Sequence, residues 1–262
     1  MKLLAGKIKV VFILVTVLGL CGCVKDYSLA PPADSVAVTV VIKVPEGLIP
    51  RKVEVMYRSG TCKRARYGGS GQRVEVDGFH GVDKLLERQG ESDLYLVSLP
   101  KDGGGKCKWN LSNISFGVAY PAINSFGDGV KYGAGGGIVV MFDDNRASRS
   151  TGYPIEVPGD LEIKKDYYPR LTERYLGGYR KTINLLGEGD IYVMYKAPRA
   201  RTIYFEPVLH SNYLVRSVGP KENKVDVGSV ITYPDGSIQA STPWGPDFRK
   251  MQAIRLKAEG KQ

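Results

Sequence analysis

Residues 51–58 read RKVEVMYR, and this stretch decides the fold class of the chain. Val53, Val55 and Tyr57 alternate with charged or polarisable residues. Successive side chains of a β-strand point to opposite faces, so the alternation predicts a strand with one face in the core and the other in water. An amphipathic helix would need apolar residues three and four positions apart. We therefore expect a strand here.

Short alternating or apolar runs of the same kind fill much of the chain. They are residues 36–43, 73–76, 93–99, 107–120, 137–142, 190–195, 201–205, 213–218, 229–233 and 237–240. In the run 107–120 the phase of the alternation shifts near Ser112 and Asn113, which predicts a β-bulge. Pro234-Asp235-Gly236 separates the last two runs and predicts a hairpin turn with its glycine in the left-handed region.

Helix signals are fewer. Residues 81–88 (GVDKLLER) could form two turns, and residues 167–176 (YYPRLTERYL) a short helix that starts at Pro169. Residues 247–259 fit either a helix or a final strand. The many short runs with close turns predict an all-β or β-rich fold, an antiparallel β-sandwich with two or three short helices.

The glycine-rich stretch 126–137 (FGDGVKYGAGGG) is the best candidate for a loop or hinge inside the chain. If it separates two parts, residues 36–125 form an N-terminal β lobe and residues 138–262 a C-terminal β lobe. The fold class is compatible with one body or with two lobes.

Residues 1–23 read MKLLAGKIKVVFILVTVLGLCGC. Three lysines precede an apolar run over residues 10–20, which is short for a membrane span and typical of a secretory signal. The ending Leu20-Cys21-Gly22-Cys23 resembles the bacterial lipobox, with Cys23 as the residue that becomes N-terminal and lipid-modified. An ordinary signal peptide or a plain membrane anchor is the alternative.

The resemblance implies that residues 1–23 are a lipoprotein signal peptide and that acyl chains on Cys23 hold the protein at a bilayer. In enterobacterial lipoproteins an Asp after the modified cysteine favours the inner membrane. Val24 stands there in this chain, which implies the periplasmic face of the outer membrane. Residues 24–35 contain Pro31-Pro32 and predict an extended tether.

The chain is basic, with 37 Lys and Arg against 27 Asp and Glu and a formal net charge of +10. Such a balance would normally suggest nucleic acid as a partner. Without residues 1–23 the net charge is +7, and the implied compartment contains no nucleic acid. We therefore expect no nucleic-acid partner. Acidic proteins, anionic lipid headgroups and cell-wall polymers are the available anions.

Two cysteines remain after the signal segment, Cys62 and Cys107. A pair in an oxidising compartment predicts a disulfide. A redox-active pair is the alternative, but it lacks the Cys-x-x-Cys spacing and a supporting histidine.

No motif for catalysis is present. Glycine-rich stretches at 68–72, 103–107 and 133–138 fail the nucleophile-elbow, phosphate-loop and dinucleotide patterns, respectively. His80 and His210 belong to no metal-ligand spacing, and Asp143-Asp144-Asn145 lacks the spaced oxygens of a calcium loop. We expect no enzyme activity, no metal and no cofactor.

Sixteen tyrosines and several cationic loops suggest a binding surface instead. Tyr132 and the turn with Arg146 and Arg149 bracket the run 137–142, and these three residues are the candidates for contact with a partner. Residues 63–67 and 196–201 add exposed cations. Ordinary solvated turns are the alternative for any one of these loops.

The lipobox, tether and motif-free β-rich body resemble the immunity lipoproteins encoded beside phospholipase effectors of type VI secretion systems. The resemblance implies a protein that binds and blocks a toxin or lipase effector. It adds no functional residue beyond Cys23. A structural or assembly lipoprotein of an envelope secretion or fibre machine is a second hypothesis. An enzyme that acts on the cell wall or on glycans is a third.

Overall fold

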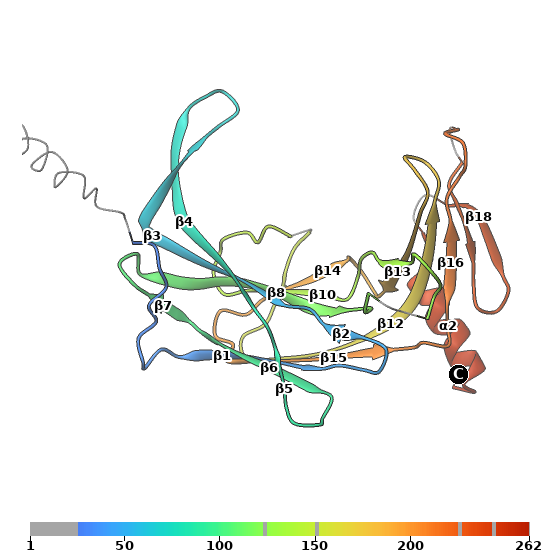
Figure 1. The fold of residues 1–262 in the computed structure, drawn as a ribbon, viewed down its shortest axis with the longest axis horizontal. Helices are drawn as coiled ribbons and strands as arrows, with labels where there is room; N and C mark the ends of the chain where they lie inside the picture. Colours follow the sequence, from blue (N-terminus) through green and yellow to red (C-terminus); the bar gives the residue numbers. More distant parts are fainter. Residues whose placement is uncertain (1–25, 123–124, 150–151, 225–226, 243–244, 262) are drawn as a thin grey trace, which may run out of the picture.

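The computed structural model describes residues 26–122, 125–149, 152–224, 227–242 and 245–261. These residues form an elongated, β-rich body in which two mixed sheets pack together (Figure 1). Among the described residues there is one α-helix, α2 (Phe248–Ala258), near the C-terminus. The β-rich fold class is confirmed.

Within the described ranges the larger sheet contains ten strands, in the order β18-β17-β16-β12-β15-β1-β6-β5, with β13 beside β12 and β9 beside β13. Its strands are β1 (Ala37–Lys43), β5 (Glu87–Arg88), β6 (Leu94–Pro100), β9 (Lys131–Tyr132), β12 (Leu161–Arg174), β13 (Arg180–Leu186), β15 (Thr202–Leu209), β16 (Val215–Val218), β17 (Ser229–Thr232) and β18 (Ile238–Thr242).

The second sheet has eight strands in the same described part of the chain, in the order β11-β14-β10-β8-β3-β4, with β2 and β7 also paired to β8. Its strands are β2 (Ile49–Pro50), β3 (Val53–Tyr67), β4 (Arg73–Lys84), β7 (Asp102–Gly104), β8 (Trp109–Ala119), β10 (Gly137–Met141), β11 (Ile155–Glu156) and β14 (Tyr192–Lys196).

The core lies between the two sheets and uses the alternation that the sequence predicts. Val53, Val55 and Tyr57 of β3 are all buried, whereas the residues between them are partly exposed. Phe116 of β8 meets Phe205 of β15 edge to face, with ring centroids 6.1 Å apart. The burial of these rings joins the two sheets through a geometry that aromatic pairs prefer.

The expectation of purely antiparallel sheets is wrong. β1 pairs in parallel with β15 (Thr39 opposite Thr202), and β12 pairs in parallel with both β15 and β16. β10 also pairs in parallel with β14. Residues before 126 and residues after 137 contribute strands to both sheets and side chains to one continuous core. The stretch 126–137 therefore does not divide the strands into one sheet before it and one sheet after it.

Two of the expected helices are strands instead. Residues 81–84 continue β4, and Glu87–Arg88 forms β5, because neighbouring strands supply hydrogen bonds that two isolated helical turns could not match. Residues 167–174 belong to β12. Pro169 lies where β12 changes partner, between the last residue paired with β15 and the first paired with β16, so its missing N–H removes no bond to either strand.

Two local predictions are confirmed, and one open alternative is decided. In the β3–β8 pairing Met56 lies opposite Asn113 and Tyr57 opposite Leu111, so Ser112 is the extra residue of a β-bulge. The turn after Tyr233 has Gly236 at φ +82°, the left-handed region that favours glycine. Residues 248–258 adopt the helical alternative, and the Asp247 side chain accepts hydrogen bonds from the first turn.

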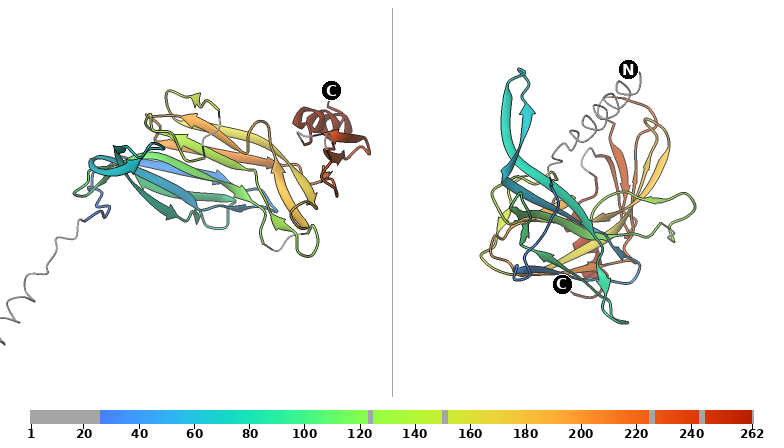
Figure 2. Two further views of the ribbon diagram at one scale, coloured as in Figure 1. Left: turned by 90° about the horizontal axis from the view of Figure 1, so that it is seen from above. Right: turned by 60° about the vertical axis from the view of Figure 1, so that its left-hand side comes forward.

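Two projections rise from the body on the same side, as Figures 1 and 2 show. One is the β3–β4 arm, defined here as residues 60–77. The other consists of the C-terminal half of β12 with β13 and β16–β18, and α2 packs at its base. The two projections lie at opposite ends of the long axis of the molecule, so their surfaces are separate from each other.

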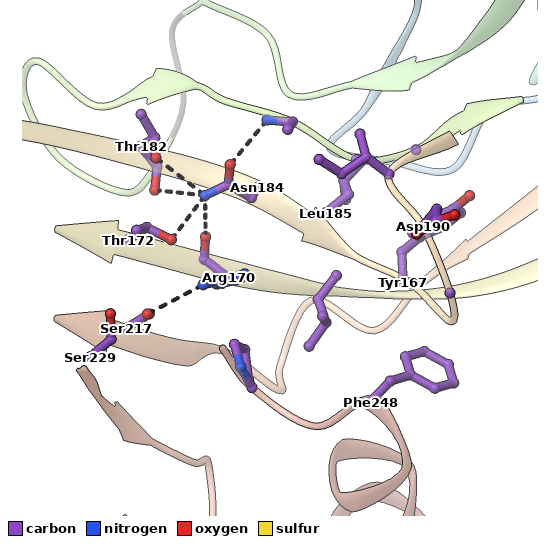
Figure 3. A pocket seen from close by; sticks show the side chains of 18 of the residues that line it. Tyr167, Arg170, Thr172, Thr182, Asn184, Leu185, Asp190, Ser217, Ser229 and Phe248 are labelled. Atoms are coloured by element: carbon purple, nitrogen blue, oxygen red, sulfur yellow. Dashed lines mark hydrogen bonds between the residues drawn. The ribbon is translucent and has the colours of Figure 1, made fainter. Parts of the chain in front are cut away.

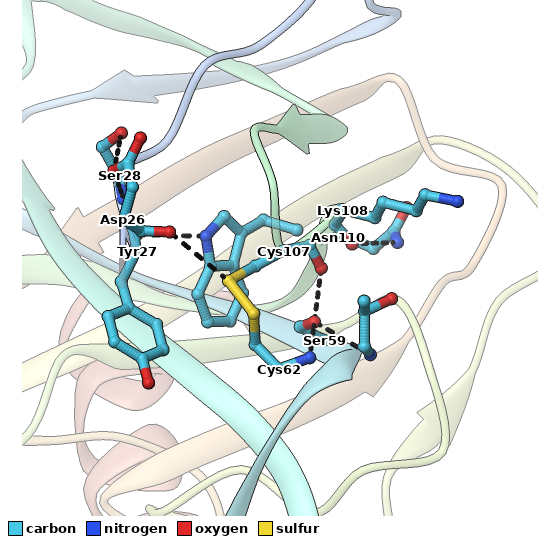
Figure 4. The surroundings of a disulfide bond; sticks show 10 residues. Asp26, Tyr27, Ser28, Ser59, Cys62, Cys107, Lys108 and Asn110 are labelled. Atoms are coloured by element: carbon cyan, nitrogen blue, oxygen red, sulfur yellow. Dashed lines mark hydrogen bonds between the residues drawn. A yellow bond between two sulfur atoms is a disulfide. The ribbon is translucent and has the colours of Figure 1, made fainter. Parts of the chain in front are cut away.

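The predicted disulfide between Cys62 and Cys107 is present, with Cα atoms 5.2 Å apart (Figure 4). It joins β3, at the base of the β3–β4 arm, to the loop before β8. The Ser59 hydroxyl donates to the Cys107 carbonyl and accepts from the Cys62 N–H at 2.9 Å. The disulfide therefore lies in a region whose backbone is also hydrogen-bonded across the two segments.

The expected tether, residues 24–35, is not free of the body where the structure describes it. The Ala30 N–H donates to the Gly103 carbonyl at 2.9 Å, and the Trp109 indole N–H donates to the Tyr27 carbonyl at 3.1 Å. Gly104 has φ +58°, and a Cβ there would meet the Ala30 carbonyl oxygen at 2.1 Å. Glycine at this position lets residues 26–30 lie directly against β7.

Tyr57 makes the stability of the protein depend on pH in the alkaline range. Its side chain is buried, its hydroxyl donates to the Pro100 carbonyl at 2.8 Å, and burial raises the pKa of the phenol to about 12. The unfolded phenol titrates near pH 10, so its contribution is complete below that pH and is lost as the pH rises towards 12. From about pH 9 to about pH 11.5 we expect wild type to lose about 2 kcal/mol more stability than Tyr57→Phe, measured by urea unfolding. Equal losses would contradict this role.

Candidate functional site

A cavity of about 760 Å³ opens beside β12, β13, β16 and the start of α2 (Figure 3). The segment 134–136 and the loop 187–191 also line it. Residues of the cavity that carry polar side chains are Lys165, Tyr167, Arg170, Thr172, Arg174, Tyr175, Thr182, Asn184, Glu188, Asp190, Ser217 and Ser229. The site thus combines a mixed polar and apolar lining with a volume suited to a side chain or small ligand.

Arg170 is the distinctive charge of this cavity. Arg170, Thr172 and Arg174 alternate along β12 and line the same space. The Arg170 Nη2 donates to the Ser217 hydroxyl at 3.4 Å, and its buried Nε has no hydrogen-bond partner. In the described part of the chain no carboxylate lies within 4.0 Å of this guanidinium.

Burial lowers the pKa of the Arg170 guanidinium, which nevertheless stays charged at any ordinary pH. A desolvated cation without a counter-charge destabilises the protein that contains it. An anionic group bound in the cavity would offset this cost, and the planar guanidinium suits carboxylate or phosphate oxygens. Lys165 is a second desolvated cation there, with a lowered pKa and its Nζ donating to the Glu188 carbonyl at 3.2 Å.

Asn184 of β13 holds the parts of the site together. Its amide nitrogen donates to the Arg170 carbonyl at 3.2 Å and to the Thr172 hydroxyl at 3.1 Å. Its amide oxygen accepts from the Ala134 N–H at 3.0 Å. One side chain therefore connects β12, β13 and the glycine-rich segment 133–136. These hydrogen bonds fix the backbone of β12 at Arg170 and so position the Arg170 side chain in the cavity.

Two of the three predicted contact residues lie in one cluster, which is outside this cavity. The Tyr192 hydroxyl is 3.1 Å from Arg51 Nη2 and 3.2 Å from Arg149 Nη1, and both guanidinium groups donate to it. Tyr132 lies close enough to Arg51 for the cation to oppose the effect of burial, which raises the pKa of Tyr132 to about 12. Arg146 is exposed and is not part of the cluster.

Arg149 has a structural partner in Glu54, with Nη1 and Oε2 2.7 Å apart. Replacing Arg149 by Glu should lower the free energy of unfolding by about 1–2 kcal/mol, because it breaks a partly buried pair and places two carboxylates together. Arg146→Glu should change it by less than about 0.5 kcal/mol. Urea unfolding of both variants tests the contrast, and equal effects would contradict it. Only Arg146→Glu then tests partner binding at this turn without a folding effect.

His210 and His80 both have partners in the described structure. His210 Nε2 lies 2.7 Å from Asp166 Oδ1 and its ring stacks on Tyr168. This resembles two members of a catalytic triad, but among the described residues no serine hydroxyl contacts His210. His80 lies against Trp109 with ring centroids 5.5 Å apart. The described residues contain no cluster of three His, Cys, Asp or Glu side chains that could hold a metal ion.

The sequence interpretation did not identify Arg170 or Asn184. Arg170 lies in a stretch that the sequence predicts as a helix, and Asn184 lies outside every predicted element. Cys23 lies outside the described residues. Comparison with family models, curated proteins and solved structures finds no match for this chain. In the described residues no helix has the length and apolar character needed to cross a membrane.

Proposed function

We propose that this chain is a lipid-anchored binding protein on the periplasmic face of the outer membrane, and that its cavity receives an acidic side chain of a protein partner. The observation that carries the proposal is Arg170, a desolvated cation with no carboxylate partner in the described residues. A partner carboxylate would complete the hydrogen bonding of this guanidinium. The lipid anchor rests on the lipobox resemblance of residues 1–23.

Within this class we propose an immunity protein that blocks an antibacterial type VI secretion lipase effector. The resemblance of the N-terminal segment and of the motif-free body supports this choice. A lipase acts at a bilayer, so an inhibitor anchored at that bilayer would meet it near its substrate. The cavity would then bind an acidic residue of the lipase.

The second candidate is a structural or assembly lipoprotein of an envelope secretion or fibre machine. The edge strands β4 and β18 favour it, since each stands at the end of its sheet in the described structure. An unpaired strand edge can pair with a strand from another protein. In this case the partner would depend on backbone pairing and would not need Arg170.

A pull-down from the producing bacterium distinguishes these functions. The bait is the chain without residues 1–23, which keeps every described contact, and the bound proteins are identified by mass spectrometry. Arg170→Gln is compared with Arg216→Gln, a matched variant because Arg216 lies on the neighbouring strand β16 and is exposed. A lipase that binds wild type and Arg216→Gln but not Arg170→Gln supports the proposal.

Other results of the same experiment have definite meanings. A component of an envelope machine that binds all three baits supports the assembly function. Binding of a lipase that is equal for all three baits keeps the immunity function and contradicts the role of the cavity. The absence of any specific partner contradicts both functions.

A further inference from the structure

The start of the described chain is attached to one end of the molecule. Tyr27 and Ala30 are hydrogen-bonded to Trp109 and Gly103, and the Cys107 Sγ lies 3.8 Å from the Asp26 carbonyl oxygen (Figure 4). Asp26 lies three positions after Cys23 in the sequence, and an extended chain covers at most about 3.6 Å per residue. A lipid anchor at Cys23 therefore has its Cα within about 11 Å of Asp26.

The β3–β4 arm starts at the same place. Cys62 of β3 is bonded to Cys107, which contacts Asp26. Ser59 lies opposite Gly78 and Arg64 opposite Val76, so four residues of β3 face a single residue of β4. Extra residues of this kind bend a strand, which accounts for the arm leaving the body at the disulfide.

The arm has a cationic and apolar face. Arg64 lies opposite Val76 and Arg66 opposite Val74, and opposite residues of an antiparallel pair share a face. This face has no carboxylate of its own between residues 64 and 76. The acidic residue Glu75 lies on the other face, with Ala65, Tyr67 and Arg73.

The exposure of the arm is unusual for its apolar residues. On the cationic face Val74 is 47% exposed, and on the other face Tyr67 is 70% exposed. Phe79, two residues after the end of the arm, is 43% exposed. The centroid of its ring lies 4.2 Å from the Arg64 guanidinium carbon. Arginine beside exposed valine and aromatic rings is the composition that proteins use at the headgroup level of a bilayer.

We propose that the β3–β4 arm lies against the bilayer that carries the lipid anchor and that Arg64 and Arg66 bind its anionic headgroup phosphates. The inference goes beyond the proposed function but rests on its lipid anchor at Cys23. The short connection to Asp26 keeps the base of the arm near the membrane surface. The net positive charge of the arm, four cations against Glu75 and Asp77, complements that surface.

The position of the arm can be measured on the full, lipidated chain in vesicles that contain phosphatidylglycerol. Gly69 in the turn between β3 and β4 has open space around it, so Gly69→Cys accepts a nitroxide label. Ala253→Cys is the matched control, because Ala253 is exposed on α2 at the opposite end of the molecule. A nickel chelate attached to lipid headgroups should relax the Gly69 label strongly and the Ala253 label weakly. Equal relaxation of the two labels would overturn the proposal.

Charge reversal tests the headgroup contact itself. Each cation near an anionic surface strengthens binding about fivefold, so Arg64→Glu with Arg66→Glu should shift the arm equilibrium away from the surface by at least about 25-fold. The Gly69 label reports this shift as a loss of relaxation. Arg249→Glu with Lys257→Glu makes the same charge change on α2 and should leave the signal unchanged. An unchanged signal in the arm variant would overturn the proposal, as would equal relaxation in purely phosphatidylcholine vesicles.

The mass of the purified chain separates this inference from the proposed function. Acyl groups on Cys23 together with a Gly69 label far from the lipid would contradict the arm contact alone. A chain without acyl groups on Cys23 would contradict the anchor and this inference together. An arm that points away from the bilayer would be accessible to a protein partner instead.

Discussion

Replacing Cys62 and Cys107 together by serine should lower the free energy of unfolding by about 4 kcal/mol. The bond joins residues 45 positions apart, and opening it restores the conformational freedom of that loop to the unfolded chain. The hydrogen bonds of Ser59 across the same two segments remain, so the folded structure itself has little reason to change.

Urea unfolding of wild type and of the double variant measures this loss. Wild type in a reductant strong enough to open the bond should match the double variant, and the variant should not respond to the reductant. Proteolysis before residue 31 should also become faster in the variant, since Cys107 contacts Asp26. A loss below about 1 kcal/mol would mean that the bond adds little to the hydrogen bonds around it.

Replacing Arg170 by Met should separate stability from binding. Partner affinity should fall at least about 30-fold, because a desolvated charge pair contributes about 2 kcal/mol or more when one member is removed. The free protein should keep its stability or gain about 1 kcal/mol, because a partly buried cation with no carboxylate partner among the described residues is replaced by an apolar side chain of similar length. A binding site that is strained in the free protein predicts this combination.

The two effects need different measurements. Calorimetric titration with the identified partner gives the affinity, and urea unfolding gives the stability of the free chain. Arg170→Lys keeps the charge but loses the planar pair of donors, so it should lie between wild type and Arg170→Met in affinity. Arg216→Gln on β16 should change neither quantity. If Arg170→Met lowers stability by 2 kcal/mol or more, Arg170 has a structural role and the cavity loses its main argument.

The strands were predictable from the sequence because their alternation is a local property. Val53, Val55 and Tyr57 are buried as a set, and the phase shift at Ser112 reports a bulge that the pairing contains. The disulfide was predictable because two of the four cysteines lie in residues 1–23, which leaves one pair. The compartment that residues 1–23 imply is oxidising, which favours a bond between them. Each of these inferences uses only neighbouring residues or a count.

The pairing of the strands was not predictable in the same way. A parallel pair such as β1 with β15 joins segments about 160 positions apart, and nothing in either segment identifies the other. A helix over residues 167–176 was predicted because Pro169 fits a helix start, and the hydrogen bonds offered by β13, β15 and β16 override that preference.

The candidate cavity depends on this same non-local pairing. Arg170 meets Ser217 only because β12 lies beside β16, and Asn184 meets Ala134 only because β9 lies beside β13. Tyr132, Arg146 and Arg149, by contrast, were selected because they lie on either side of one predicted strand. Tyr132 and Arg149 do lie in one cluster around Tyr192, whereas Arg146 lies outside it.

The position of β1 has a consequence for how the chain reaches its folded state. β1 lies between β6 and β15, so the first strand can pair on one side early but gains its other neighbour only when residues 202–205 are available. A chain that crosses a membrane from its N-terminus would expose this strand edge during most of its passage. Contacts of such large sequence separation also slow folding. We expect refolding to be slow and sensitive to chain concentration, and a chain that ends before residue 202 should aggregate.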